Sequence, residues 1–485
     1  ARLLAPMREK TDGKAVLLHR EHVTLHLKLQ TMKNYLSRTF ILTLLVVVAL
    51  LGLHFLPAIT INGYTLRRVN LLSDVEVKEP EPELLDTVPL PPPVKPAFVD
   101  TCKTGLTCIE DYADSTQRGM KPFYEALSHV SQRPVRIAYF GDSFIEADIL
   151  TGDLRDLLQA RYGGCGVGFV DITSNTHGFR QTVRHNFGGW RTRGILDSLG
   201  YDPARLGLSG HYFIPREGAY VEAQTPKVSR GRLDSCEVAT IFFENKGPVT
   251  LTTTVNGVDG EPRTVEGNGR LQKLDCTGNI KRVRWTVNRA DTATFYGFAM
   301  DGRTGIAVDN FGVRSSSGLT MRSIPMSRLR QFNTYRPYDL IVLQFGLNVA
   351  TPRGSNYDGY ERGMLTVIEH LKEAFPQAGI LVVGVGDREH KDEEGNLRTM
   401  PGVKNLIRYQ QTIAAKAGVA FWNLYDAMGG EGSIRRMVQA KPAQANLDYT
   451  HINFHGGKVL AKQLYETLIY GKEQYDKRKA YENEQ

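Results

Sequence analysis

The sequence has little cysteine, with five residues in 485. No Cys-x-x-Cys pair and no cluster of cysteine and histidine shows the spacing of a zinc site, so we expect no metal and no other cofactor. Cys102 and Cys108 are close enough in sequence to close a small disulfide loop. Cys236 and Cys276 flank strand-like segments and form a second candidate pair, which would leave Cys165 over.

The bulk of the chain lacks a strong charge of either sign. The formal net charge is +8, but residues 1–38 hold eight Lys or Arg against three acidic residues. That segment supplies +5, which leaves +3 for the other 447 residues. Nucleic-acid-binding domains carry a concentrated basic patch, so this distribution argues against a nucleic-acid partner.

Long hydrophobic runs are absent except for one near the start of the sequence. Residues 40–55, FILTLLVVVALLGLHF, are apolar at all but two positions. An α-helix needs about 20 apolar residues to span a bilayer, so we expect a transmembrane signal anchor over residues 39–58. No small-x-small cleavage pattern follows, which favours an anchor over a cleaved signal peptide. Lys33 and Arg38 precede the run, so the positive-inside rule predicts that the rest of the chain is exported.

The sequence has no internal repeat, but its composition changes along the chain. Residues 76–96 are rich in proline and glutamate, which favours a stiff spacer without a core. Further on, apolar strands alternate with helices, a pattern that predicts a mainly parallel sheet in a three-layer α/β fold. Residues 175–304 interrupt this alternation with short strand-like runs, which predicts an inserted β-sandwich. The expected regions are a basic segment (1–38), an anchor (39–58), a linker (59–98), the first part of the α/β domain (99–174), the insertion (175–304), the second part (305–472) and a charged tail (473–485).

One apolar strand stops abruptly, because residues 135–146 read VRIAYFGDSFIE. Gly, Asp and Ser all favour turns, so a plain turn is one interpretation. The other is a nucleophile, since open α/β sheets place their chemistry at the carboxyl ends of the strands. If Ser143 is a nucleophile, it needs a base, a carboxylate to orient that base, and donors for an oxyanion. Asp142 is then expected to structure the turn.

Candidates for these partners follow other predicted strands. Asp448 and His451 stand three residues apart before the closing helix, which lets the carboxylate reach one imidazole nitrogen and leaves the other for the serine proton. Asn348 follows the strand LIVLQF, and its amide can donate to an oxyanion. Gly312 follows the run GIAV, and its N–H would be a further donor. His455 is a competing base, but the Asp-x-x-His spacing favours His451.

In the order Ser, Gly, Asn and Asp-x-x-His, these segments resemble the blocks of the SGNH (GDSL-type) serine hydrolases. The resemblance covers residues 130–172 and 305–470 and implies an acyl-enzyme mechanism. It implies the following roles: nucleophile for Ser143, general base for His451, orienting carboxylate for Asp448, and oxyanion donors at the Ser143 N–H, the Gly312 N–H and the Asn348 side chain.

The insertion narrows the substrate that the resemblance implies. Residues 140–170 and 295–313 are similar to peptidoglycan O-acetylesterases of the bacterial envelope, in which a carbohydrate-binding-like β-sandwich lies between the serine block and the second block. The implied substrate is an O-acetylated polysaccharide, with peptidoglycan as the first candidate. The resemblance also implies a catalytic domain in the periplasm that is anchored to the inner membrane. Trp190 and Arg191, in the stretch GGWRTRG of the insertion, are candidate glycan contacts.

Three alternatives stay open. A lipase is the first, although no long apolar lid is evident in the sequence. An O-acetyltransferase of the cell envelope would use the same triad, and the sequence does not separate it from an esterase. A glycan-binding envelope protein without catalysis would lack one of the catalytic blocks, whereas all of them are present here.

Overall fold

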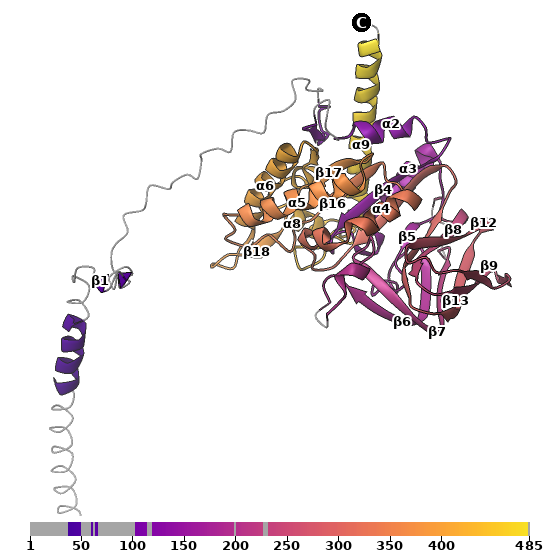
Figure 1. The fold of residues 1–485 in the computed structure, drawn as a ribbon. Helices are drawn as coiled ribbons and strands as arrows, with labels where there is room; N and C mark the ends of the chain where they lie inside the picture. Colours follow the sequence, from indigo (N-terminus) through magenta and orange to yellow (C-terminus); the bar gives the residue numbers. More distant parts are fainter. Residues whose placement is uncertain are drawn as a thin grey trace, which may run out of the picture. The chain divides into compact units, whose positions relative to one another are not determined.

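The computed structural model describes residues 37–49, 60–61, 64–65, 102–113, 119–197, 200–226 and 231–483 (Figure 1). The chain divides into two compact units, Ala1–Pro89 and Leu90–Gln485.

The described part of the first unit is small. It consists of a helix over residues 37–49 and a pair of antiparallel strands, β1 (Thr60–Ile61) and β2 (Tyr64–Thr65). In the part of the chain that the structure describes, no helix combines the length and the apolar character needed to cross a membrane. The second half of the predicted anchor and most of the predicted linker lie outside the described residues.

The second unit is built on a six-stranded sheet with the order β15-β4-β16-β17-β20-β3. Its first five strands run parallel and its edge strand β3 pairs antiparallel, which confirms the predicted mainly parallel α/β sheet. The strands are β15 (Gly305–Gly312), β4 (Pro134–Gly141), β16 (Leu340–Gln344), β17 (Gly379–Val383), β20 (Ala420–Trp422) and β3 (Glu110–Asp111).

The helices of this unit fall into two packed groups, as expected for a parallel sheet that is covered on both faces. One group contains α2 (Lys121–Leu127), α3 (Thr151–Tyr162), α7 (Leu424–Met428) and α9 (Phe454–Asn483), and the other contains α4 (Met326–Tyr335), α5 (Asp358–Ala374) and α6 (Pro401–Ala417). The remaining elements are α8 (Ser433–Gln439), the 3₁₀ turns η1 (Glu146–Asp148), η2 (Pro203–Arg205) and η3 (Leu319–Ser323), and the hairpin β18 (Glu389–Lys391) with β19 (Leu397–Thr399).

Between α3 and β15 the chain forms a second, ten-stranded sheet, all of whose pairings are antiparallel. Its inner side chains line a second hydrophobic core around Trp285 and Phe298, separate from the core of the parallel sheet. Its strands are β5 (Gly168–Val170), β6 (Arg184–Gly194), β7 (His211–Gln224), β8 (Cys236–Asn245), β9 (Val249–Val255), β10 (Val258–Asp259), β11 (Arg263–Val265), β12 (Leu271–Ile280), β13 (Arg282–Ala290) and β14 (Ala293–Asp301).

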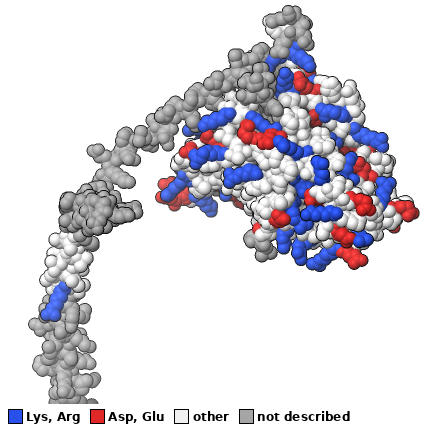
Figure 2. Space-filling model, in the orientation of Figure 1, with Lys and Arg blue, Asp and Glu red and all other residues white. Residues whose placement is uncertain are grey.

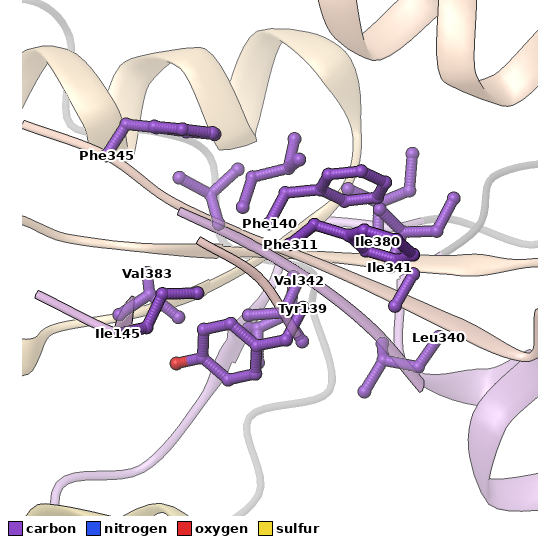
Figure 3. Close-up of a cluster of buried hydrophobic side chains, with 14 of the residues drawn as sticks. Tyr139, Phe140, Ile145, Phe311, Leu340, Ile341, Val342, Phe345, Ile380 and Val383 are labelled. Carbon is purple, nitrogen blue, oxygen red and sulfur yellow. The ribbon is translucent and has the colours of Figure 1, made fainter. Parts of the chain in front are cut away.

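The core of the parallel sheet supports the strand that leads to Ser143. Figure 3 shows aromatic and aliphatic side chains of β4, β15 and β16 packed together. Phe140 and Phe311, opposite each other in the parallel register of β4 and β15, stack with ring centroids 4.7 Å apart. Both side chains are buried, so the carboxyl end of β4 is held in a fixed position.

The cysteines confirm one predicted pair and contradict the other. Cys102 and Cys108 form a disulfide bond. The predicted pairing of Cys236 with Cys276 is wrong, because both are free thiols, as is Cys165. The register of β8 and β12 gives the reason: Cys276 lies opposite Ala239, and Cys236 lies opposite Ile280.

Candidate active site

The turn that carries Ser143 is fixed by the residues just before it. Gly141 ends β4 so close to β16 that a Cβ atom there would lie 2.8 Å from the Gln344 carbonyl oxygen. The buried Asp142 carboxylate accepts hydrogen bonds from the Phe144 N–H at 3.0 Å and the Leu347 N–H at 3.2 Å. Asp142 therefore joins the loop after β4 to the loop after β16, which supports its predicted role in the turn.

Burial of Asp142 has an electrostatic consequence. It raises the pKa of this carboxyl group to about 6, although the hydrogen bonds from Phe144 and Leu347 act in the opposite direction. Asp142 is next to Ser143 in the chain, but the carboxylate that hydrogen-bonds His451 is that of Asp448.

The three residues predicted as a triad lie together. Ser143 Oγ is 2.9 Å from His451 Nε2, and His451 Nδ1 is 2.7 Å from Asp448 Oδ2. The other carboxylate oxygen of Asp448 accepts the backbone N–H groups of Thr450 and His451, each at 3.0 Å. These two bonds close a tight turn before α9 and hold the carboxylate against the imidazole.

The electrostatics of Asp448 suit this arrangement. Partial burial raises its pKa, but the hydrogen bonds from the His451 backbone and side chain and from Thr450 outweigh burial, and the net shift is downward. The carboxylate therefore stays ionised at neutral pH and favours the tautomer of His451 with the proton on Nδ1. In that tautomer Nε2 is a hydrogen-bond acceptor for the Ser143 hydroxyl.

The predicted oxyanion donors differ in how they are engaged. Asn348 is exposed just after β16, and its amide nitrogen donates to the Ser316 carbonyl at 3.0 Å. An amide nitrogen carries two hydrogens, so this bond orients the side chain and leaves one hydrogen for a ligand. Because Asp142 holds the Leu347 N–H, the loop that carries Asn348 is tied directly to the nucleophile turn.

Gly312 also lies at the site, at the end of β15 and beside the Glu146 backbone. Its N–H donates to Asn310 Oδ1 at 2.8 Å, so it already has an acceptor in this structure. The Asn310 amide nitrogen in turn donates to the Ile145 carbonyl at 2.7 Å and to Thr151 Oγ1 at 2.6 Å. Sequence reasoning did not single out Asn310, although it stands two residues before Gly312 in the same run.

A second group that the sequence did not reveal is the fully buried Asp148, the last residue of η1, five positions after Ser143. Ala147 and Asp148 both have positive φ, at 51° and 63°, a conformation that costs energy in residues other than glycine. The Asp148 carboxylate compensates by accepting hydrogen bonds from four side chains, Thr151, Arg155, Arg180 and Thr182. The pKa of Asp148 is lowered, because Arg155 and Arg180 outweigh the effect of burial.

The predicted glycan contacts lie on β6. The Trp190 indole N–H donates to the Tyr220 carbonyl at 2.7 Å, and its ring meets Phe295 edge-on with centroids 5.1 Å apart. Much of this indole therefore packs on the second core, whereas Arg191 is exposed. Their role in glycan binding stays a prediction.

His455, in the first turn of α9, is exposed, and its backbone N–H donates to Asn453 Oδ1.

Two further features of the described residues are the distribution of charge on the surface and the grouping of side chains that could bind a metal ion. On the face shown in Figure 2, basic and acidic side chains are mixed over the second unit. Among the described residues, no group of three or more His, Cys, Asp or Glu side chains is placed to hold a metal ion.

No family model and no curated protein sequence matches the chain. Its fold is similar to a solved structure of a peptidoglycan O-acetylesterase, with 21% identity and a TM-score of 0.62 over 76% of this chain and 99% of the other. A family two carbohydrate esterase from Clostridium thermocellum matches at 11% identity and a TM-score of 0.26, over 57% of this chain and 97% of the other. The chain therefore shares the fold of this peptidoglycan O-acetylesterase structure.

Proposed function

We propose that the protein is a serine esterase that removes O-acetyl groups from a glycan, with peptidoglycan as the first candidate. The observation that carries this proposal is the continuous chain of hydrogen bonds from Ser143 through His451 to Asp448. The similarity in fold to a peptidoglycan O-acetylesterase supports the choice of substrate. The two cores, one under the serine loop and one in the antiparallel region, are consistent with an esterase unit that carries a glycan-binding unit.

In the first half of the reaction, Ser143 Oγ attacks the acetyl carbonyl carbon while His451 Nε2 takes the hydroxyl proton. Asp448 stabilises the imidazolium that forms, and the oxyanion accepts hydrogen bonds from the Ser143 N–H and the second Asn348 amide hydrogen. The carbon–oxygen bond to the sugar then breaks, and His451 gives its proton to the departing sugar oxygen. The products are a free sugar hydroxyl and an acetyl group on Ser143.

In the second half, water attacks the acetyl-enzyme. His451 takes a proton from the water, the oxyanion occupies the same donors, and the bond between the acetyl carbon and Ser143 Oγ breaks. His451 returns the proton to Ser143, and acetate leaves. For Gly312 to act as a third donor, its N–H must exchange Asn310 Oδ1 for the oxyanion.

The proposal includes a place for the enzyme, with residues 39–58 as an inner-membrane anchor and the catalytic unit in the periplasm. Two observations support it. The described helix over residues 37–49 exposes apolar side chains, including Phe40 and Leu42, that are suited to lipid. The Cys102–Cys108 disulfide suits an oxidising compartment. Protease added outside the inner membrane of intact spheroplasts should degrade the catalytic unit, and full protection would contradict this placement.

The test of the function is acetate release by the full chain in detergent. Wild-type protein should release acetate from a small aryl acetate and from O-acetylated peptidoglycan. Release from peptidoglycan should be faster than release from acetylated plant polysaccharide. Ser143→Ala should release acetate from none of these substrates. Undiminished release by Ser143→Ala would refute the mechanism. With ¹⁴C-acetyl donor and a glycan acceptor, an esterase accumulates label in acetate, whereas label in the acceptor would establish an acetyltransferase instead.

A further inference from the structure

A short segment of the antiparallel region, residues 174–180, is fastened to the nucleophile loop. The Arg180 guanidinium donates to Asp148 Oδ2 through Nε at 3.0 Å and through Nη2 at 2.7 Å. The Arg180 side chain is 8% exposed and the Asp148 side chain is fully buried, so solvent does not weaken this ion pair. The residue next to Arg180 is therefore held at a fixed position relative to Ser143.

That residue, Phe179, is held by its own backbone as well. The N–H groups of Phe179 and Arg180 both donate to the Thr176 carbonyl, at 3.2 and 3.1 Å, which closes a compact turn. In spite of this order, the Phe179 side chain remains 41% exposed. Phe179 is therefore an exposed aromatic ring on an ordered turn, and such a ring can pack against an apolar face of a ligand.

Phe179 has charged neighbours from the loops around Ser143. The Arg314 guanidinium lies over the Phe179 ring at 6.0 Å from the centroid, and it forms an ion pair with Glu146 through both carboxylate oxygens. Glu146 stands three residues after Ser143, and its Cα is 3.2 Å from the position of a Cβ on Gly312. The aromatic ring and the ion pair therefore border the nucleophile turn.

This combination has the chemistry of a carbohydrate subsite. The face of an aromatic ring packs against the C–H face of a pyranose, and paired charged groups at its edge accept and donate hydrogen bonds to hydroxyl and amide substituents. Arg314 and Glu146 neutralise each other, which suits an uncharged sugar ring better than an anionic ligand.

We propose that Phe179, Arg314 and Glu146 form the subsite that holds a sugar ring of the acetylated glycan next to the ester being cleaved. This inference rests on the proposed function. It assigns the main aromatic contact to Phe179 rather than Trp190, whose indole is bonded inward to Tyr220. Arg180 acts through Asp148 as a positioning residue, because it places the ring without facing the substrate.

The test compares kcat/KM for O-acetylated peptidoglycan with kcat/KM for a small aryl acetate, which has no sugar ring to stack. In the full-length protein, Phe179→Ala should lower the ratio of these two values by about 5- to 10-fold, mainly through KM for the glycan. Phe179→Tyr should keep the ratio. The matched control is Val258→Ala on β10 of the antiparallel sheet, where Val258 is a 72% exposed apolar residue, and it should leave both values unchanged.

Each outcome separates the subsite from the function it depends on. Wild-type protein that cleaves neither ester would refute the proposed function itself. Wild-type protein that cleaves the glycan, together with an unchanged ratio in Phe179→Ala, would overturn the subsite alone. An equal loss on both substrates would also overturn it, because Phe179 would then support the fold of the nucleophile loop rather than hold a sugar.

Discussion

Ser143 and His451 are separated by 308 residues in the chain, yet Ser143 Oγ and His451 Nε2 lie 2.9 Å apart. The serine follows β4, which lies between β15 and β16 in the parallel sheet, and the histidine precedes α9. The ten-stranded antiparallel sheet occupies much of the sequence between them. Only the closure of the α/β fold around that region brings the hydroxyl and the imidazole into hydrogen-bond contact.

The Asp448 carboxylate should contribute to turnover through the charge and tautomer of His451. Asp448→Asn keeps an oxygen that can accept the Thr450 and His451 N–H groups, so the turn should persist. It removes the acceptor for Nδ1–H, and kcat for a small acetate ester should fall by about 10³- to 10⁴-fold. Circular dichroism should show an unchanged fold. A loss of less than about tenfold would mean that the carboxylate only shapes the turn.

The Asn348 side chain should matter to the transition state more than to substrate binding. Asn348→Ala should lower kcat by about 100-fold with little change in KM, since the amide donates to an oxyanion that exists only during the reaction. Asn333→Ala on α4, which removes an amide that pairs with Gln377, is the matched control and should keep full turnover. An effect confined to KM would assign Asn348 to substrate positioning.

The Asp142 carboxyl should make stability fall as pH rises. Its pKa of about 6 in the folded protein exceeds the ordinary value of 3.8, so the folded state binds more protons between these values. The stabilising contribution is complete below pH 3.8 and is lost as pH rises through 6, by about 3 kcal/mol in total.

Urea unfolding of wild type and Asp142→Asn at several pH values measures this contribution. Because the asparagine does not titrate, the stability of the variant relative to wild type should increase between pH 4 and pH 7. A difference that stays constant over this range would show that Asp142 does not titrate there.

The Asp148 network should stabilise the link between the nucleophile loop and residues 174–182. Asp148→Ala leaves two guanidinium groups, those of Arg155 and Arg180, without their buried partner, and should cost about 3–5 kcal/mol of unfolding free energy. Arg180→Ala leaves Asp148 paired with Arg155 and should cost less. Equal losses in the two variants, measured by denaturant unfolding, would contradict this ranking.

The sequence predicts well what depends on local spacing. Asp448 and His451 lie within one turn, so their contact follows from a three-residue separation, and the strand before Ser143 is visible as an apolar run. The mainly parallel sheet follows from the alternation of strands and helices.

What the sequence does not predict depends on register or on burial. The register of β8 and β12 keeps Cys236 and Cys276 from facing each other, and no feature of either segment reveals it. The sequence does not predict that the Asp148 carboxylate is buried, because its burial depends on an ion pair with Arg180 from a separate segment of the chain. The inward hydrogen bond of Trp190 to Tyr220 likewise exists only once β6 pairs with β7.

The most direct test of the catalytic assignment is covalent labelling with a fluorophosphonate, followed by peptide mass spectrometry. The reagent should add one phosphonyl group to Ser143 in the wild-type protein, and His451→Ala should slow the labelling by several orders of magnitude. Labelling of a different residue, or an equal rate without the imidazole, would contradict the claim that Ser143, His451 and Asp448 act as one nucleophilic unit.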